Sequence, residues 1–117
     1  GNYLCYPGPE VRGGKFTYLG VNQYTRQWGR QSTYGGKLTE NACQSLARDV
    51  MASPMPIIDA AGYPIVLSVH DELLTEPADS PEFNAEHLSS LLATPAPWCA
   101  DMPLAASGFE AYRYRKD

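Results

Sequence analysis

Between residues 36 and 53, apolar side chains recur at the spacing of an α-helix. Residues four positions apart lie on one face of a helix, and Pro54 ends the pattern because proline cannot continue it. The repeat predicts a helix over about residues 36–53 whose apolar face is buried in a core. The residues of that face are Leu38, Ala42, Leu46 and Val50.

A second helical repeat covers about residues 81–93, and it precedes a proline-rich segment. Ser80 is suited to the N-cap of this helix and Pro81 to its first position, where the missing N–H costs nothing. We therefore predict a second amphipathic helix. Its apolar residues are Phe83, Leu88, Leu91 and Leu92.

Three other segments have the composition of strands. In residues 1–34, Tyr3–Tyr6 and Phe16–Leu19 flank turn-forming residues and predict a hairpin, for which Gly13 and Gly14 permit positive φ. Residues 64–76 predict a second hairpin, made of Ile65–Val69 and Leu73–Thr75 around a polar turn. Alternation over residues 104–116 predicts a closing strand.

These elements predict an α+β fold in which an antiparallel sheet is flanked by two main helices. The length of 117 residues and the 44% hydrophobic content favour a single compact domain. No apolar run approaches the roughly 20 residues of a membrane helix, so no membrane partner is expected. Three cysteines without metal-binding spacing favour a reducing compartment, and we expect the cytoplasm. Because the first residue is Gly1, we also expect a piece of a longer protein.

The net charge of −4 is unevenly divided along the chain. Residues 1–50 hold six Lys and Arg against three Asp and Glu, a net of +3, whereas residues 51–117 hold three against ten, a net of −7. A basic half can approach a phosphate backbone while an acidic half binds metal cations. Ordinary solvated charge explains the same division, so charge alone does not decide between them.

The predicted helix over residues 36–53 carries a donor-rich face opposite its apolar face. At 100° per residue, the four side chains of this face fall within about 60° of one another. They are candidates for contacts with phosphate or base edges. They are Lys37, Asn41, Gln44 and Arg48. The neighbouring Asp49, toward the apolar side, has no explanation in this pattern.

Three consecutive ionisable residues, His70, Asp71 and Glu72, interrupt the apolar second hairpin. Buried carboxylates cost several kcal/mol unless a positive partner offsets their desolvation. Two adjacent oxygen ligands suit Mg²⁺, which completes its coordination with water and substrate phosphates. The competing interpretation is a solvated turn after a strand, which four residues alone do not exclude.

The sequence LSVHDELL, after a helix of pattern K-L-T-E-N-x-x-Q-x-x-A-R-D, resembles the third catalytic motif and the preceding palm helix of family A DNA polymerases. NQYTRQWGRQSTYGGKLTENACQSLARDV, PAPWCADMPL and SGFEAYRYRK are similar to the C-terminal stretch of the phage-type branch, so the resemblance spans nearly the whole chain. It implies a palm built as an antiparallel sheet with flanking helices. The implied activity is template-directed nucleotidyl transfer in DNA replication or repair.

At matching positions, the resemblance implies roles for individual residues. Asp71 corresponds to the aspartate that binds the catalytic Mg²⁺ ions, Glu72 to an adjacent acid that contributes less directly, and His70 to a residue near the primer end. Gln44 corresponds to a glutamine that contacts the minor groove, where all Watson–Crick pairs present similar acceptors. The implied partners are primer-template DNA and a deoxynucleoside triphosphate.

The chain also departs from the family pattern. The second metal-binding aspartate, from a D-Y-S-x-x-E-type motif, is absent, and no Arg-Lys fingers helix precedes Tyr34. We therefore expect the C-terminal palm portion of a longer polymerase that is inactive by itself. 

Two alternatives stay open. The first is a noncatalytic nucleic-acid-binding module that uses the donor-rich helix face and the YRYRK run at residues 112–116. The second is a metal-dependent hydrolase or nuclease in which His70, Asp71 and Glu72 form the site, with His87 as a further ligand.

Overall fold

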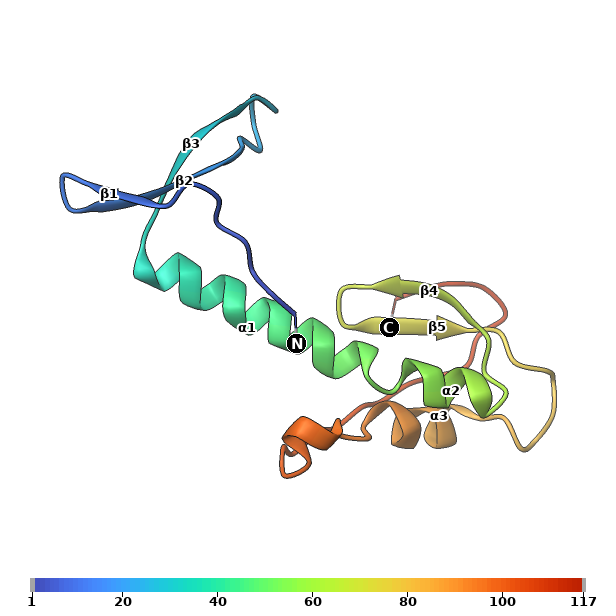
Figure 1. Ribbon diagram of the computed structural model, residues 1–117. Coiled ribbons are helices and arrows are strands. Elements are labelled where there is room, and N and C mark those ends of the chain that lie inside the picture. The colour runs from blue at the N-terminus through green and yellow to red at the C-terminus, as the bar shows by residue number, and fades with distance from the viewer. Residues whose placement is uncertain (1, 117) are drawn as a thin grey trace. The chain divides into compact units, whose positions relative to one another are not determined.

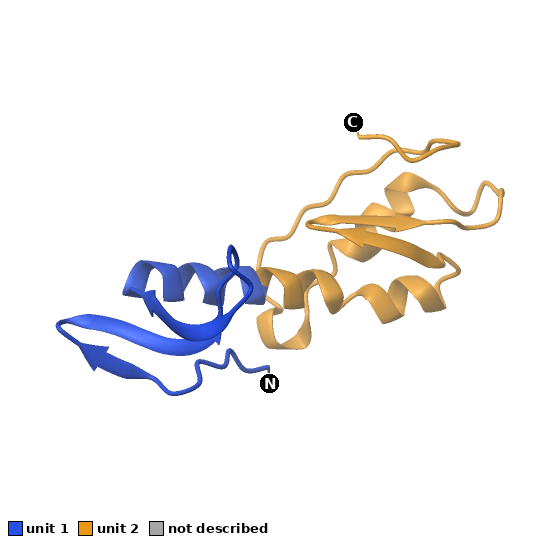
Figure 2. Ribbon diagram, turned by 90° about the horizontal axis from the view of Figure 1, so that it is seen from above, with its two compact units in different colours: residues 1–46 blue, residues 47–117 orange. Residues whose placement is uncertain are grey.

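The computed structural model describes residues 2–116. The chain divides into two compact units, residues 1–46 and 47–117, and the division falls inside the longest helix, α1 (Figures 1 and 2). The α+β class, with antiparallel strands and two main helices, is confirmed, and the strands form two separate sheets. The elements are β1 Glu10–Arg12, β2 Lys15–Val21, β3 Trp28–Thr33, α1 Gly35–Ala52, α2 Met55–Ala60, β4 Ile65–Val69, β5 Glu72–Thr75, α3 Ala85–Leu92 and the 3₁₀ turn η1 Pro97–Cys99.

The first unit contains the three-stranded antiparallel sheet β1-β2-β3. Gly13 and Gly14 form the two-residue connection between β1 and β2, and both have positive φ (56° and 76°), as the prediction required. Positive φ at both central residues matches the right-handed twist of the strands that they join.

The predicted strand Tyr3–Tyr6 is wrong, because the segment that pairs with β2 is Glu10–Arg12. The short Gly13-Gly14 turn fixes the register, so the residues directly before it must form the partner strand. Tyr6 instead packs edge-to-face on Tyr18, with ring centroids 5.1 Å apart.

The second unit holds the fully buried side chains. Ile58 of α2 and Tyr63, in the connection to β4, are 0% and 1% exposed. The ring of Phe83 meets Tyr63 edge-to-face at 5.2 Å between centroids. These residues pack the α2–β4 connection against the segment that leads into α3, which gives this unit its core.

Helix α2 was not predicted from the sequence. Pro54 occupies its N-cap and Pro56 its first turn. The first N–H groups of a helix have no intrahelical acceptor, so prolines are tolerated there. Proline therefore marks the beginning of this helix, whereas the sequence interpretation treated it only as a breaker.

Helix α3 begins at Ala85, four residues later than predicted. Its N-cap is Asn84, whose Oδ1 accepts a hydrogen bond from the backbone N–H of His87 at 2.8 Å. The prediction of Ser80 as N-cap is wrong, since the Ser80 hydroxyl donates to the Glu82 carboxylate instead. Residues 80–83 instead form a turn, closed by a hydrogen bond from the Phe83 N–H to the Ser80 carbonyl at 3.0 Å, and the buried Tyr63 hydroxyl accepts from the Asn84 N–H at 3.3 Å.

The predicted closing strand at residues 104–116 is also wrong, because this segment joins no sheet. Side chains hold it in place: Glu110 Oε1 accepts a hydrogen bond from the Ala85 N–H at 3.0 Å, and the Arg115 guanidinium lies 5.3 Å from the Phe109 ring centroid. Alternation of apolar and polar residues matches the two-residue period of a strand. A strand also needs the edge of a sheet with free backbone N–H and C=O groups to pair with.

Helix α1 confirms the predicted bounds to within one residue, but none of its residues is buried. Leu46, in the middle of the predicted apolar face, is 53% exposed. The prediction that the apolar face of α1 is buried in a core is therefore wrong for residues 2–116. Across residues 2–116, no helix combines the length and apolarity needed to cross a membrane.

Candidate functional site

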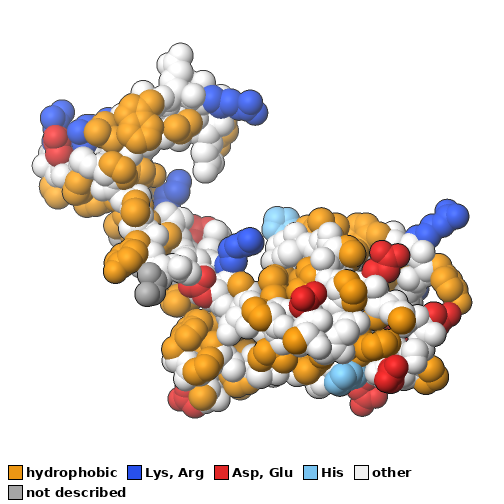
Figure 3. Space-filling view, turned by 45° about the vertical axis from the view of Figure 1, so that its right-hand side comes forward, with side chains coloured by type: hydrophobic (Ala, Val, Ile, Leu, Met, Phe, Trp, Pro, Cys, Tyr) orange, Lys and Arg blue, Asp and Glu red, His pale blue; other side chains and the backbone are white. Residues whose placement is uncertain are grey.

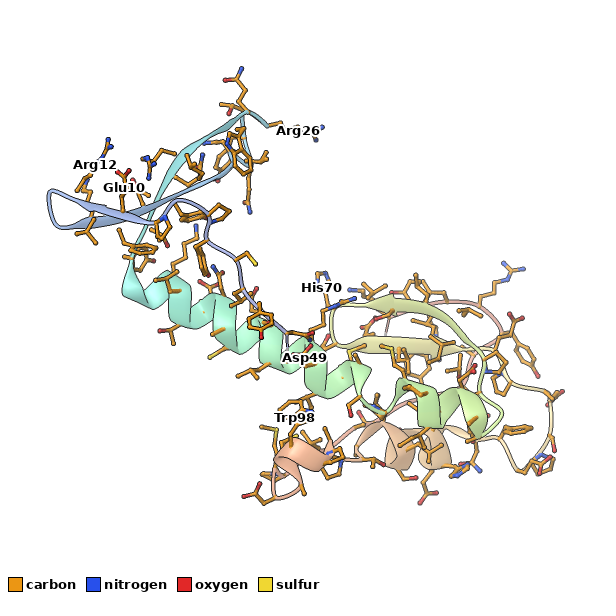
Figure 4. All side chains as sticks on the ribbon, in the orientation of Figure 1. Glu10, Arg12, Arg26, Asp49, His70 and Trp98 are labelled. Atoms are coloured by element: carbon orange, nitrogen blue, oxygen red, sulfur yellow. The ribbon has the colours of Figure 1, made fainter. Side chains whose placement is uncertain are left out.

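The ionisable triplet lies where strands β4 and β5 meet. Val69 pairs with Glu72, so His70 and Asp71 are the two residues of a tight connection. His70 has a φ of 53°, and Asp71 does not share this left-handed conformation. Positive φ at the first central residue is usual in the two-residue turns that join antiparallel strands. The predicted hairpin is thus confirmed, and its turn presents His70 at the tip (Figure 4).

The side chains of His70 and Asp71 are exposed and make no hydrogen bond or ion pair with any part of residues 2–116. Glu72 is half-buried, and its Oε2 accepts a long hydrogen bond from the Tyr114 hydroxyl at 3.4 Å. The sequence argument assumed that the carboxylates were buried and needed a cation to offset desolvation. That assumption is wrong for Asp71, which is exposed at the turn, and Glu72 is only half-buried.

The donor set at this turn fits part of a magnesium site. Mg²⁺ takes one or two protein carboxylates and fills its remaining positions with water and phosphate oxygens. Asp71 supplies one unpartnered carboxylate, and Glu72 is its neighbour in sequence. Among the described residues, no group of three or more His, Cys, Asp or Glu side chains could hold a metal ion.

His87, the further ligand of the hydrolase alternative, already has a partner. Its Nδ1 lies 2.8 Å from the hydroxyl oxygen of the buried Tyr63. That hydroxyl accepts from the Asn84 N–H, so its own hydrogen is available to donate to Nδ1. The arrangement ties α3 to the core and gives no support to a ligand set shared with His70, Asp71 and Glu72.

The predicted donor face of α1 is partly engaged within the protein. Asn41 is half-buried, and its Nδ2 donates to the Tyr6 hydroxyl at 3.1 Å. Gln44 is exposed, and its Nε2 donates to Glu40 Oε1 at 3.3 Å. Lys37 and Arg48 are exposed and have no polar partner among residues 2–116.

The two units divide these candidates. Lys37, Asn41 and Gln44 belong to the first unit, whereas Arg48 and the β4–β5 turn belong to the second. Asp49, for which the sequence pattern had no explanation, is half-buried on the second unit's part of α1 (Figure 4). The structure brings together His70, Asp71 and Glu72, and it places the other candidates along one helix.

Sequence reasoning missed Tyr114 as a partner of the site. The tyrosine lies in the YRYRK run, which was interpreted as a strand or a stacking surface, and its hydroxyl instead contacts Glu72. A separation of 42 residues leaves no local signal for such a contact. Only a tertiary structure can reveal it.

Comparison with known proteins gives one strong similarity. The chain is 39% identical, over 124 aligned residues, to a protein of Bacillus phage SP02 described as "DNA polymerase". The match covers 100% of this chain but 19% of that relative, so the chain spans about a fifth of the length of the protein it matches. No protein-family model matches the chain, and no solved structure matches it.

Proposed function

We propose that this chain is the C-terminal palm portion of a family A DNA polymerase of phage type, and that it brings Asp71 to the site of nucleotidyl transfer. The observation that carries the proposal is the β4–β5 turn, where an exposed and unpartnered Asp71 carboxylate follows a strand. The similarity to the phage polymerase extends over the whole chain, including this turn. 

Asp71 and Glu72 are the residues that would hold Mg²⁺. When bound, the metal would stabilise negative charge on the attacking and leaving oxygens of a phosphoryl transfer. The exposed Asp71 carboxylate has free oxygens for this role, whereas one Glu72 oxygen already accepts a hydrogen bond from Tyr114. Glu72 therefore contributes less directly than Asp71.

The proposed DNA contacts are made by His70 and by the donor face of α1. Lys37 and Arg48 are exposed cations suited to phosphate, and Gln44 can exchange its weak bond to Glu40 for a minor-groove acceptor. Asn41 is the weakest candidate, because its amide already holds Tyr6. The substrates, primer-template DNA and a deoxynucleoside triphosphate, would meet these residues in a longer protein.

The chain by itself should not extend a primer. One exposed aspartate with one neighbouring glutamate cannot by itself position two metal ions, a primer end and a triphosphate. We also propose a cytoplasmic location, which the three cysteines support because none of them forms a disulfide.

A chimera tests the proposal directly. The matching segment of the phage SP02 polymerase is replaced by this chain, and Mg²⁺-dependent primer extension is measured. We expect the chimera to incorporate nucleotides, Asp71→Asn to lose at least about 100-fold in rate, and Glu72→Gln to lose about 10-fold, since electrostatic groups at a reacting centre have effects of this size. 

Matched acids serve as controls. Asp101→Asn and Glu76→Gln remove exposed carboxylates from the same unit and should leave the rate within about twofold. A folded chimera that incorporates nothing, or one in which Asp71→Asn and Asp101→Asn behave alike, would contradict the proposal. 

Direct metal binding gives a second test on the 117-residue chain itself. Mn²⁺ should broaden the backbone NMR signals of Asp71 and Glu72 before those of Asp101, and Asp71→Asn should abolish this selectivity. Equal broadening at all exposed acids would show that the turn is no cation site.

A further inference from the structure

The tip of the β2–β3 hairpin is an ordered loop. Asn22 and Gln27 close it, through a hydrogen bond from the Asn22 N–H to the Gln27 carbonyl at 2.9 Å. The Asn22 side-chain oxygen accepts from the N–H groups of Tyr24 and Thr25 at 2.8 and 3.1 Å. These bonds satisfy the loop backbone locally, so the loop holds its side chains in a defined arrangement.

This ordered loop exposes large aromatic side chains. Tyr24 is 96% exposed and Trp28, the first residue of β3, is 64% exposed. Trp28 pairs directly with Val21, itself 56% exposed, so the two side chains share one face of the sheet. Apolar surface that is held outward in this way typically marks a binding site.

In the sequence of this loop, the cationic residue Arg26 stands between the aromatic residues Tyr24 and Trp28. The Arg26 side chain extends from the end of the hairpin (Figure 4) and has no polar partner among residues 2–116; the Arg26 backbone N–H donates to the Asn22 carbonyl at 2.8 Å. Its φ of 56° is disfavoured for most residues other than glycine, although asparagine also adopts it readily. By contrast, Arg30 on β3 is engaged with Glu10 and with the Thr17 hydroxyl. Arg26 is therefore the cation that stays available at this tip.

The charge of the first unit complements a polyanion. Residues 1–46 carry five Lys and Arg side chains against two Asp and Glu, a net of +3. Figure 3 shows Lys and Arg side chains together with hydrophobic side chains on the visible face of this unit. Exposed aromatic rings combined with free cations are the elements that single-stranded nucleic-acid sites use, because rings stack on bases and cations pair with phosphates.

We propose that the β2–β3 tip, residues 21–28, binds single-stranded nucleic acid: Tyr24 and Trp28 stack on bases, and Arg26 pairs with a backbone phosphate. A duplex fits this site less well, because its bases are already stacked on one another. A polypeptide partner also fits less well, because the polar Gln23, Thr25 and Gln27 separate the aromatic side chains. The proposal goes beyond the polymerase role, since it concerns a different site and does not depend on Asp71.

Tryptophan fluorescence of the 117-residue chain tests this proposal. The variant Trp98→Phe removes the other exposed tryptophan, so that Trp28 alone reports. An oligo(dT) strand should quench Trp28 saturably at low salt, and Tyr24→Ala should weaken binding about 5- to 100-fold, as loss of one stacked base does. Arg26→Ala should lower the slope of log affinity against log salt by roughly 0.7, the value for one phosphate contact on a single strand.

Matched controls separate stacking at the tip from general attraction. Tyr3→Ala removes an 89% exposed tyrosine, and Lys15→Ala removes an exposed cation from the opposite end of β2. Neither should change affinity by more than about twofold, and Asp71→Asn should leave binding intact even if the polymerase proposal fails. 

Four results would overturn the proposal. They are the absence of quenching in a chain whose circular dichroism shows it folded, equal losses from Lys15→Ala and Arg26→Ala, equal affinity for blunt duplex, and equal quenching by heparin, which has charge but no bases.

Discussion

Replacing Gly62 by alanine should destabilise the second unit strongly. Gly62 lies between α2 and Tyr63 and has a φ of 96°, a conformation that residues with a side chain rarely adopt. A Cβ atom at this position would lie 2.8 and 2.9 Å from two ring carbons of Phe83. The same ring packs edge-to-face on the buried Tyr63.

The structure allows the magnitude of this effect to be worked out. The left-handed backbone costs alanine about 1–2 kcal/mol relative to glycine. Carbon atoms normally meet at about 3.5–4.0 Å, so the Phe83 ring must move by more than half an ångström, which typically costs about 1–3 kcal/mol. Lower entropy of the unfolded chain returns about 0.4–1 kcal/mol. The expected net loss for Gly62→Ala is therefore about 1–4.6 kcal/mol.

Urea unfolding monitored by Trp98 fluorescence, in a Trp28→Phe background, measures this loss in the second unit. The double variant Gly62→Ala with Phe83→Leu separates the two causes, because the smaller side chain relieves the overlap but not the backbone strain. We expect the two substitutions to couple by at least about 1 kcal/mol.

Gly14→Ala supplies the matched control, followed through Trp28 in the first unit. Gly14 also has a positive φ, of 76°, but its Cβ would meet nothing within 4 Å, so only the backbone cost of about 1–2 kcal/mol, less the same entropic return of about 0.4–1 kcal/mol, should appear. The reasoning is refuted if Gly62→Ala costs no more than Gly14→Ala, or if the effects of Gly62→Ala and Phe83→Leu simply add.

Three further predictions concern stability and reactivity. Tyr63→Phe should cost about 1–2 kcal/mol of unfolding free energy, because its hydroxyl loses two hydrogen bonds, whereas Tyr112→Phe at a fully exposed position should cost nothing measurable in the same urea titration. Asn84→Ala removes the N-cap of α3 and should cost about 1 kcal/mol, while Asn84→Asp should retain most of the stability; equal losses would contradict the capping role. A maleimide reagent should modify the two exposed thiols at least about tenfold faster than the buried one, and equal rates by mass spectrometry would contradict the core described for the second unit. The thiols are Cys5, Cys43 and Cys99.

Local patterns predicted several elements well. The four-residue repeat gave α1 to within one residue, and the polar interruption between two apolar runs gave the β4–β5 hairpin. In both cases the information lies in neighbouring residues, since helix periodicity and tight-turn chemistry act over a few positions. The Gly13-Gly14 turn was found for the same reason, whereas the strand assigned to Tyr3–Tyr6 required a choice of register that composition could not make.

Some features of the candidate site could likewise be predicted from local sequence, and others could not. The adjacency of His70, Asp71 and Glu72 is fixed by the sequence, and so is their position in a turn between strands. Their exposure is not, and the desolvation argument for a cation failed because burial depends on what covers the turn. The bond from Tyr114 to Glu72 likewise depends on the path of the last segment of the chain.

By itself, the sequence determined the helical and strand periods, the turn at Asp71, the charge difference between the two halves and the resemblance to a polymerase. Only the tertiary structure decided that α3 starts at Ala85, that residues 104–116 join no sheet, and that Leu46 stays exposed. The physical reason is the range of the interactions. Periodicity and turn chemistry are local, whereas burial and hydrogen-bond partners come from residues far away in the chain.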